Sequence, residues 1–332
     1  MARSRVGATL LALLAGVALV GCGSAASGRV TAPSSPTPAR WTALVHVKRP
    51  LDLVGPRRDG SIVLAANGRL WLLARSGTVQ PFAPAYKSPG GEEPYIALAP
   101  QGSCFGGGTV YALRLAAGRG VVAIGAQGSV RRLAGISTPG LLDGIAFDQT
   151  GAFGHRLLVT INHGSTTTVD AISCGGVVSA ITGTAPRVEG GIAVAPATFG
   201  RFAGDLIAPD ETGGRIFGIS PRGQSWLVAD SGLPHGPDIG VESEAFVPGD
   251  HHAGALVADR LTPGNPHPGD DVVLRLTAAA LNAAGVHAGD LLVATEGGAL
   301  ADAVRCGAGG CQVRHVADGP AIAHVEGHIA FR

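Results

Sequence analysis

Short apolar segments separated by glycine, proline and aspartate recur along most of the chain. The segment EGGIAVAPATFGRFAGDLIAPDETGGRIFGISPRG, which begins at Glu189, illustrates the pattern. GIAV is short and apolar, as a buried strand should be, and GDLIAPD, GRIFGIS and SWLVADS follow as three further strand-like segments with turn residues between them. Helical periodicity is confined to LTAAALNAAG. The pattern therefore predicts an all-β protein built from repeated four-stranded units.

The spacing of the repeat indicates its architecture. Copies of the first segment align on one alanine, with successive gaps of 49, 47, 52 and 85 residues, at Ala97, Ala146, Ala193, Ala245 and Ala330. Periods of about 40 to 50 residues with several short strands each are typical of a β-propeller blade. Five units follow, of which the last lacks a recognisable first strand: 93–135, 141–184, 189–230, 240–277 and 281–317.

The two ends of the chain supply the parts of a sixth unit. Residues 60–82, GSIVLAANGRLWLLARSGTVQPF, resemble second, third and fourth strands, and EGHIAFR at 326–332 resembles a first strand. Pairing of about 61–83 with 326–332 would close the ring and leave no exposed sheet edge. We therefore expect a six-bladed propeller over residues 46–332, with an open array of β-sandwiches as the alternative.

The repeated pattern EG-hydrophobic-A-F … G-x-F-G-G-D-L-L-V … G-x-I-x-x-I resembles the six-bladed propellers of the gluconolactonase, strictosidine-synthase and NHL-repeat superfamily. The resemblance covers nearly all of residues 60–332. It implies that first strands begin, and second-to-third-strand loops open, on the same face of the disc beside the central channel. It implies no single activity, because this superfamily includes lactonases, phosphotriesterases, lyases, quinone-dependent sugar dehydrogenases and binding modules.

The N-terminal residues have the features of an export signal. Arg3 and Arg5 precede the apolar run LLALLAGVALVG, and Leu19-Val20-Gly21-Cys22 resembles the bacterial lipobox, whose cysteine carries a diacylglycerol. We expect residues 1–21 to be a lipoprotein signal peptide and residues 22–45 to be the lipidated Cys22 with a flexible linker. The protein would then be anchored to the cell membrane on its extracytoplasmic side. A plain signal peptide is the alternative.

Composition narrows the possible partners. The formal net charge is +1, from 25 basic and 24 acidic residues, and the chain has only 15 aromatic residues. Neither value favours binding to nucleic acid, which requires a basic surface and bases stacked on aromatic rings. We expect a monomer whose partners are the membrane, through the lipid anchor, and a small molecule.

Four cysteines remain after Cys22, and an even number outside the cytoplasm favours disulfides. Cys306 and Cys311 flank the turn-forming spacer GAGG, which favours a local bridge. Cys104 and Cys174 lie in turns that propeller geometry places on the far face of neighbouring blades, so a Cys104–Cys174 bridge is expected. Zinc binding is the alternative, although CxxxxC without a second matching pair is a weak metal motif.

Five carboxylates each precede an aligned alanine by three or four residues: Glu93, Asp143, Glu189, Glu242 and Glu326. They would ring one end of the channel, where like charges need protons, arginine partners or a cation. Oxygen-rich rings suit Ca²⁺ or another divalent cation. The resemblance to lactonases implies a metal held by a first-strand Glu with Asn and Asp from other blades, here Glu189 or Glu326 with Asn162, Asp210 and Asp259. The alternative is that these acids cap turns in solvent.

Loops on the same face supply further candidates. Second-to-third-strand loops bring His163, Glu211, Arg260 and Glu296 toward the channel mouth as ligand-binding residues. The longest of them, ADRLTPGNPHPGDD, is the first candidate for binding specificity because long loops on a scaffold often carry it. His267 in this loop, and His235 in the loop before Glu242, are candidate catalytic bases.

The functional hypothesis rests on the fold and the acidic residues, because the sequence contains no familiar catalytic motif. GxSxG, HExxH, Walker and dinucleotide-binding motifs are absent from the sequence. We expect an extracytoplasmic lipoprotein propeller that binds a small ligand at the channel mouth and, as an enzyme, hydrolyses a lactone or ester with a divalent cation. A non-catalytic binding or interaction propeller is the alternative. A quinone-dependent sugar dehydrogenase is less favoured, because such enzymes hold the quinone carboxylates with basic residues, whereas this rim is mostly acidic.

Overall fold

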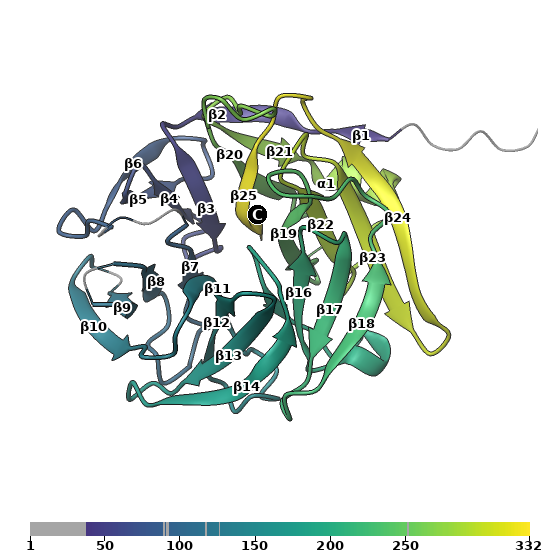
Figure 1. Ribbon diagram of the computed structural model, residues 1–332. Helices are drawn as coiled ribbons and strands as arrows, with labels where there is room; N and C mark the ends of the chain where they lie inside the picture. Colours follow the sequence, from purple (N-terminus) through teal and green to yellow (C-terminus); the bar gives the residue numbers. More distant parts are fainter. Residues whose placement is uncertain (1–37, 89, 91–92, 117, 126, 251) are drawn as a thin grey trace, which may run out of the picture. The chain divides into compact units, whose positions relative to one another are not determined.

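Six sheets are arranged radially around a central channel in the computed structural model, which describes residues 38–332 except 89, 91, 92, 117, 126 and 251 (Figure 1). Blades 1 to 4 follow the chain, each from an inner to an outer strand. Blade 1 comprises β3 (Pro50–Val54), β4 (Ile62–Ala66), β5 (Arg69–Leu73) and β6 (Val79–Phe82). Blade 2 comprises β7 (Ile96–Leu98), β8 (Val110–Arg114), β9 (Gly120–Ile124) and β10 (Val130–Gly135).

Blades 3 and 4 have the same order. Blade 3 comprises β11 (Leu141–Phe147), β12 (Leu157–His163), β13 (Thr166–Ile172) and β14 (Val178–Pro186). Blade 4 comprises β15 (Ala193–Val194), β16 (Leu206–Asp210), β17 (Arg215–Ile219) and β18 (Ser225–Asp230), with the short 3₁₀ helix Gly200–Phe202 between its first two strands. An acidic residue lies within each of the inner strands β3 and β11 and shortly before each of the short inner strands β7 and β15.

Blades 5 and 6 are interleaved in sequence. Blade 5 runs from the inside as β19 (Val241–Phe246), β22 (Leu291–Thr295), β23 (Ala301–Gly307), β24 (Gly310–Asp318) and β1 (Ala39–Arg40). Blade 6 runs as β25 (Val325–Phe331), β20 (Ala255–Asp259), β21 (Val272–Leu276) and β2 (Thr42–His46). The chain therefore leaves blade 5 after β19, builds β20 and β21, and returns through helix α1 (Ala278–Ala283).

The six-bladed ring closed by both ends of the chain is confirmed, but the predicted strand pairing is wrong. The C-terminal strand β25 pairs with β20, and β4 pairs with its own inner strand β3. PLDLV was missed as a strand because an acidic residue interrupts it. Asp52 is nevertheless fully buried, since its carboxylate accepts hydrogen bonds from the backbone N–H groups of Leu53, Ile96 and His328. Likewise, the missing first strand of unit 281–317 is β19.

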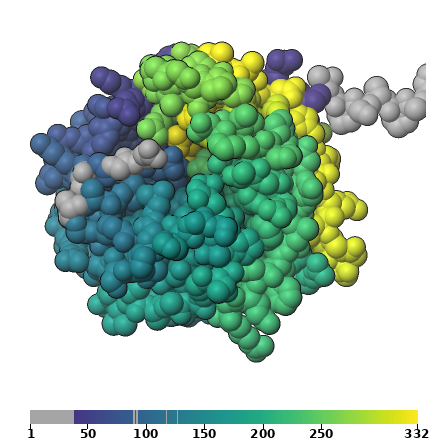
Figure 2. Space-filling view, in the orientation of Figure 1, coloured from purple at the N-terminus to yellow at the C-terminus, as the bar shows by residue number. Residues whose placement is uncertain are grey.

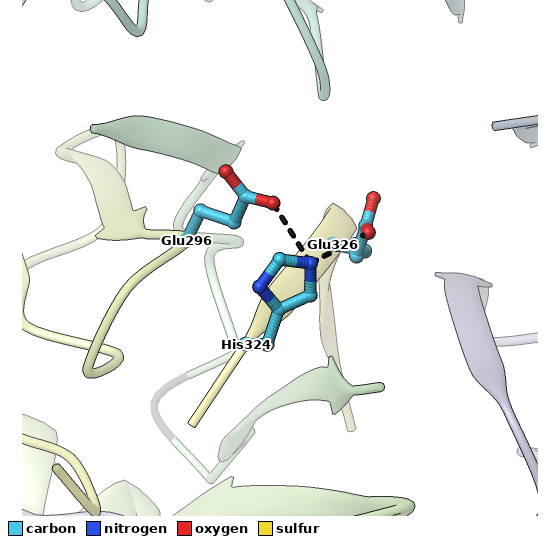
Figure 3. Close-up of side chains that lie close together, drawn as sticks. All are labelled: Glu296, His324 and Glu326. Atoms are coloured by element: carbon cyan, nitrogen blue, oxygen red, sulfur yellow. Dashed lines mark ion pairs between the residues drawn. The ribbon is translucent and has the colours of Figure 1, made fainter. Parts of the chain in front are cut away.

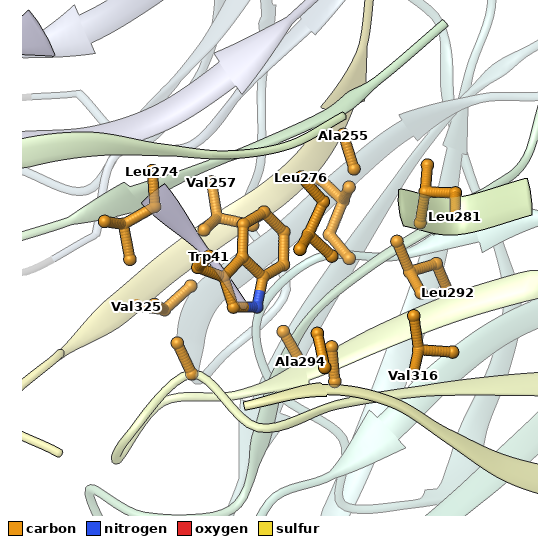
Figure 4. Packing of buried hydrophobic residues seen from close by; sticks show 14 of the residues in the cluster. Trp41, Ala255, Val257, Leu274, Leu276, Leu281, Leu292, Ala294, Val316 and Val325 are labelled. Carbon is orange, nitrogen blue, oxygen red and sulfur yellow. The ribbon is translucent and has the colours of Figure 1, made fainter. Parts of the chain in front are cut away.

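The N-terminal segment fastens blades 5 and 6 together. β1 lies parallel to β24 and β2 lies antiparallel to β21. Between these strands Trp41, which is 5% exposed, lies in one cluster with apolar side chains from both blades (Figure 4), among them Leu274, Ala294 and Val325. Strands β1 and β2 add residues 39–46 to the propeller, ahead of the boundary at residue 46 expected from the sequence. Residues 1–37, including Cys22, lie outside the described residues.

Both expected disulfides are present. Cys104 and Cys174 join a turn of blade 2 to a turn of blade 3, with Cα atoms 5.8 Å apart, and Cys306–Cys311 crosses the β23–β24 hairpin. Among the described residues, none of the helices has the length and apolar character needed to cross a membrane.

Candidate functional site

Carboxyl groups from three blades converge at the channel mouth. Glu242 lies at the start of β19, Glu326 at the start of β25, and Glu93 just before β7. One oxygen from each lies within 4.8 Å of the others, and Glu242 and Glu326 are 5% and 2% exposed. In the space-filling view, yellow atoms of the C-terminal part of the chain are visible near the centre of the ring (Figure 2). We call Glu93, Glu242, Glu296, His324 and Glu326 the mouth cluster.

Tyr95 connects two members of the mouth cluster. Its fully buried hydroxyl lies 2.6 Å from Glu242 Oε1 and 3.1 Å from Glu326 Oε2. A phenol carries one proton, so both contacts are satisfied when one carboxyl group is protonated. Burial, then the charge of Glu93, raises the pKa of Glu242 well above its usual value, so Glu242 holds the second proton. Burial also raises the pKa of Tyr95, which therefore keeps its own proton.

Glu326 is the acid of the mouth cluster whose pKa is lowered. Arg260 Nη1 donates a hydrogen bond to Glu326 Oε1 at 3.0 Å, and His324 Nε2 lies 3.3 Å from the same oxygen. Burial alone would raise the pKa of Glu326, but the hydrogen bond from His324 and the charge of Arg260 outweigh it and lower the pKa. This carboxylate is therefore a fixed negative charge at the channel mouth.

His324 lies between two carboxyl groups, as Figure 3 shows. Its Nε2 atom lies 2.9 Å from Glu296 Oε1, on the opposite side from Glu326. Burial opposes ionisation of the imidazole, but the hydrogen bonds to Glu296 and Glu326 raise the pKa of His324 to about 10. The residue is 2% exposed and is an imidazolium at neutral pH, so it acts as a proton donor rather than as a base.

Two further acids stay protonated around the mouth cluster. Burial, followed by the negative charge of Glu296, raises the pKa of Glu211 to about 9. Burial likewise raises the pKa of Asp143 to about 8, against the opposing hydrogen bond from the Gly190 N–H group at 2.9 Å. Six acids thus face two cations, Arg260 and His324. Protons or an added cation must balance the excess negative charge.

Below the mouth cluster, His328 and Asp52 form the next layer of the channel. The His328 backbone N–H and its Nδ1 atom lie 2.8 and 3.0 Å from Asp52 Oδ1. Gly327 allows this approach, because its φ of 69° is left-handed and an added Cβ there would lie 2.5 Å from the same oxygen. Burial would lower the pKa of His328, but the charge of Asp52 outweighs it and raises the pKa.

Of the five residues expected to hold a metal, Glu326 is the one within the mouth cluster. Asp259 is fully buried and positions His324 by accepting its backbone N–H at 2.9 Å. The other three have different partners: Glu189 pairs with Arg187, Asp210 pairs with Arg215 at 2.6 Å, and Asn162 donates to Asp143 and to the Val188 carbonyl.

The other predicted residues are divided between the cluster and the rim. Arg260 and Glu296 lie in or against the mouth cluster, and Glu211 is beside Glu296. His163 and His235 are exposed. His267 Nδ1 lies 2.7 Å from the Ala321 carbonyl, and its ring packs on Gly297, next to Glu296. No hydrogen bond or ion pair joins these three histidines to the mouth cluster within the described chain.

His324, which the sequence places just before Glu326 at the mouth, and Tyr95 are residues of the site that were given no role from the sequence. A signal for His324 exists in the last strand, where HVEGH places a polar side chain at every second residue, 324, 326 and 328, of a buried segment. Alternation of this kind in an inner strand directs residues 324 and 326 to one side, here the channel, and the left-handed Gly327 interrupts the alternation before His328. Tyr95 has no comparable signal, since it precedes an apolar strand and resembles a core residue.

The mouth cluster has the donor set of a site for a hard divalent cation. Oxygens up to 4.8 Å apart can reach one Ca²⁺, whose oxygen ligands lie about 2.3–2.6 Å away. Glu93, Glu242 and Glu326 supply three carboxyl groups, and burial raises the pKa of Glu93 as it does that of Glu242. A cation there would displace their protons. The residues present therefore fit a cation, and uptake would release protons.

Comparison with known proteins supports the fold. No known family model matches the chain, and no curated protein matches it. A solved structure of unknown function from Bacteroides thetaiotaomicron is 12% identical, with 89% of this chain and 70% of that chain covered and a TM-score of 0.51. Virginiamycin B lyase from Staphylococcus aureus is 13% identical over 81% and 84% of the chains (TM-score 0.44), and a gluconolactonase-like protein is 13% identical over 73% and 93% (TM-score 0.38). The match with a TM-score of 0.51 agrees with the six-bladed propeller that the strand order defines.

Proposed function

We propose that this propeller binds a divalent cation between Glu93, Glu242 and Glu326 and acts there on a small ligand, with hydrolysis of a lactone or ester as the reaction class. The observation that carries the proposal is the convergence of three carboxyl groups from three blades within 4.8 Å. Like charges brought so close in a buried site are costly unless a shared partner balances them. Ca²⁺ is the first candidate, because all of these ligand atoms are oxygens.

The chemistry would be divided among the neighbouring residues. When bound, a divalent cation supplies Lewis acidity toward a carbonyl oxygen and lowers the pKa of water. Arg260 holds Glu326 in its ionised form, and Asp259 fixes the backbone of His324. Hydrolysis adds water across the acyl C–O bond, and the leaving oxygen requires a proton. His324 is the donor that this site offers for it, because its pKa keeps it protonated at neutral pH.

Cation binding is tested by titration of the folded chain with Ca²⁺, Mg²⁺, Mn²⁺ and Zn²⁺, followed by calorimetry, melting temperature and elemental analysis of the native protein. We expect one ion per chain and a raised melting temperature. Glu242→Gln and Glu326→Gln should weaken cation binding at least about tenfold, because each replaces a carboxylate ligand with an uncharged amide of nearly the same shape. Glu189→Gln is the matched control, because Glu189 pairs with Arg187 outside the mouth cluster. Absence of binding by all four ions would disprove the metal site.

A non-catalytic ligand-binding propeller is the second candidate, and the burial of the mouth cluster favours it. Glu326 and His324 are each 2% exposed, so a substrate has little direct access to them unless the channel mouth opens. Turnover of a panel of lactones and aryl esters separates the two functions. Hydrolysis that is lost in Glu326→Gln and retained in Glu189→Gln supports the enzyme, whereas ion binding without turnover supports the binding module.

We also propose that the chain is a lipoprotein held at the extracytoplasmic side of the membrane through Cys22. The support is the sequence alone, with two arginines, an apolar run and Leu-Val-Gly-Cys in order. Mass spectrometry of the N-terminal peptide from the native host should find a diacylglycerol on Cys22. Partition of a Cys22→Ala variant into the detergent phase to the same extent as the wild type would contradict the anchor.

A further inference from the structure

A basic cavity lies beside the acidic mouth cluster. It has a volume of about 280 Å³ and is bounded by β3, by the β4–β5 turn, by the segment after β6, and by Arg260 from the segment after β20. Three arginines and three neutral polar residues line it: Arg49, Arg69, Arg260, Asn67, Tyr86 and Ser88. We call this space the arginine cavity. Its basic lining differs from the mostly acidic rim expected from the sequence.

The described residues that line the arginine cavity do not balance its positive charges. No acidic side chain is among the described residues that line it. Arg69 Nη1 donates to the backbone carbonyls of Pro84 and Tyr86 at 3.1 and 3.2 Å, which hold the guanidinium in place without neutralising it. Arg49 has no side-chain ion pair or hydrogen bond within the described chain. Of the three arginines, Arg260 is the one with a carboxylate partner among the described residues, which is Glu326 on the side of the mouth cluster.

The neutral residues of the cavity extend the same donor character. Asn67 and Gly68 form the tight turn between β4 and β5, with φ values of 49° and 68°, which sets this wall on a short and rigid hairpin. Burial raises the pKa of Tyr86 to about 12, so its hydroxyl remains a proton donor over the physiological range. Guanidinium, amide and hydroxyl groups together present many N–H and O–H donors and few acceptors.

We propose that the arginine cavity binds an oxyanion, the carboxylate or phosphate group of a small molecule. Guanidinium groups match the planar and forked geometry of these anions and bind them through charge-assisted hydrogen bonds. The volume is at the lower end for ligand pockets, so it suits a compact acid of a few carbon atoms. Because Arg260 contacts both the cavity and Glu326, the remainder of such a ligand would point toward the mouth cluster.

The neighbouring acids do not prevent anion binding. None of Glu93, Glu242 and Glu326 is among the described residues that line the arginine cavity, and Glu326 is paired with Arg260 at 3.0 Å and lies 3.3 Å from His324. The oxyanion site rests on Arg49 and Arg69, which take no part in the proposed cation site. The two proposals can therefore fail independently.

The test uses propionate and inorganic phosphate as probes, with propionamide as an uncharged isostere of propionate, at constant ionic strength set with sodium chloride. Saturation-transfer NMR and calorimetry on the folded chain should detect saturable binding of at least one oxyanion and none of propionamide. Arg49→Gln should weaken it at least about tenfold, the loss expected for one hydrogen bond to a charged group. Arg222→Gln, a change of the same charge in an exposed turn, should leave it unchanged.

Each remaining outcome decides the proposal. Binding of phosphate without propionate, or the reverse, supports the site and identifies its oxyanion. Equal binding of propionamide, equal binding by Arg49→Gln and wild type, or no saturable binding of either anion would overturn it. Near-UV circular dichroism verifies that Arg49→Gln is folded. Cation uptake by Arg49→Gln and propionate binding by Glu242→Gln should both be retained, which separates this site from the proposed cation site.

Discussion

The hydroxyl of Tyr95 lies 2.6 Å from Glu242 Oε1, which links blade 2 to blade 5 across the channel. Tyr95→Phe removes the hydroxyl that accepts the proton of neutral Glu242 and donates to Glu326 Oε2, so two buried carboxyl groups lose this partner. We expect a loss of about 1–3 kcal/mol in the free energy of unfolding, as is usual for an unsatisfied buried polar group. The loss should grow as the pH rises, because ionised Glu242 depends more on a donor than neutral Glu242 does. Urea unfolding at pH 6 and pH 8 measures both effects.

Tyr111→Phe is the matched control for this prediction. The Tyr111 hydroxyl is also fully buried, and it donates to the Phe105 carbonyl at 2.7 Å within blade 2. Its removal should lower stability by a similar amount at both pH values, since a backbone carbonyl does not titrate. A Tyr95→Phe variant within about 0.5 kcal/mol of the wild type at pH 8 would show that the hydroxyl does not stabilise the cluster.

Stability should fall as the pH rises from 6 to 9 in the absence of divalent cations. Burial raises the pKa of Asp143 to about 8 and that of Glu211 to about 9, so the folded chain retains protons that the unfolded chain has lost. His324 acts in the same direction, because its stabilisation is complete below the unfolded pKa of about 6.5 and is lost as the pH rises through about 10. Each proton retained contributes a slope of about 1.4 kcal/mol per pH unit.

Thermal unfolding in metal-free buffer from pH 6 to pH 9 measures this slope. Asp143→Asn should flatten it, since the amide has no proton to lose, and Asp230→Asn on the exposed edge of blade 4 should not. Saturating Ca²⁺ should also flatten it if the cation replaces protons in the mouth cluster. A melting temperature that is constant or rises over this range would contradict the raised pKa values.

Much of the fold was predictable because a propeller repeats one local pattern. Segments such as GIAV and GDLIAPD alternate apolar strands with turn residues, and this information is local. The pairing at the closure is not local. β19 resembles the start of unit 240–277, yet it pairs with β22, fifty residues later, because the choice among equivalent inner strands depends on packing between blades. Nothing in the composition of the strands specifies that choice.

The candidate site was predictable to a lesser extent for a related reason. Register places one acid at each inner-strand start, so Glu93, Glu242 and Glu326 follow from the repeat. The repeat does not tell which of these acids lack a cationic partner and so remain available to bind a ligand, because the partners come from distant parts of the chain. Arg187 is two residues from Glu189 and pairs with it, whereas Arg260 reaches Glu326 from 66 positions away. The arginine cavity likewise joins residues 49, 69 and 260, which no local pattern connects.

Trp41 should be required for closure of the ring. Its side chain is 5% exposed and packs between blades 5 and 6, so Trp41→Ala should cost about 3–5 kcal/mol. Trp226→Ala is the matched control, because Trp226 on β18 is 46% exposed and should tolerate the same truncation within about 1 kcal/mol. Denaturant unfolding of both variants makes the comparison. Equal losses of unfolding free energy in the two variants would show that Trp41 does not hold blades 5 and 6 together.

The two disulfides should differ in what they contribute to stability. Cys104–Cys174 closes a loop of 70 residues, and Cys306–Cys311 closes a loop of 5. In the chain-entropy account, a crosslink restricts the unfolded state more when its loop is longer, which gives about 4 and about 2 kcal/mol respectively. Replacement of each pair by serine, followed by denaturant unfolding under oxidising conditions, tests the order.

Cys104 is exposed, so little packing is lost with it, whereas Cys306 is 5% exposed and its replacement adds a burial penalty. Cys306→Ala/Cys311→Ala avoids burying a serine hydroxyl at position 306, so this pair is the better variant to compare with the Cys104–Cys174 replacement. A smaller loss on removal of Cys104–Cys174 than of this pair would mean that the two neighbouring blades are already held together before the bridge forms.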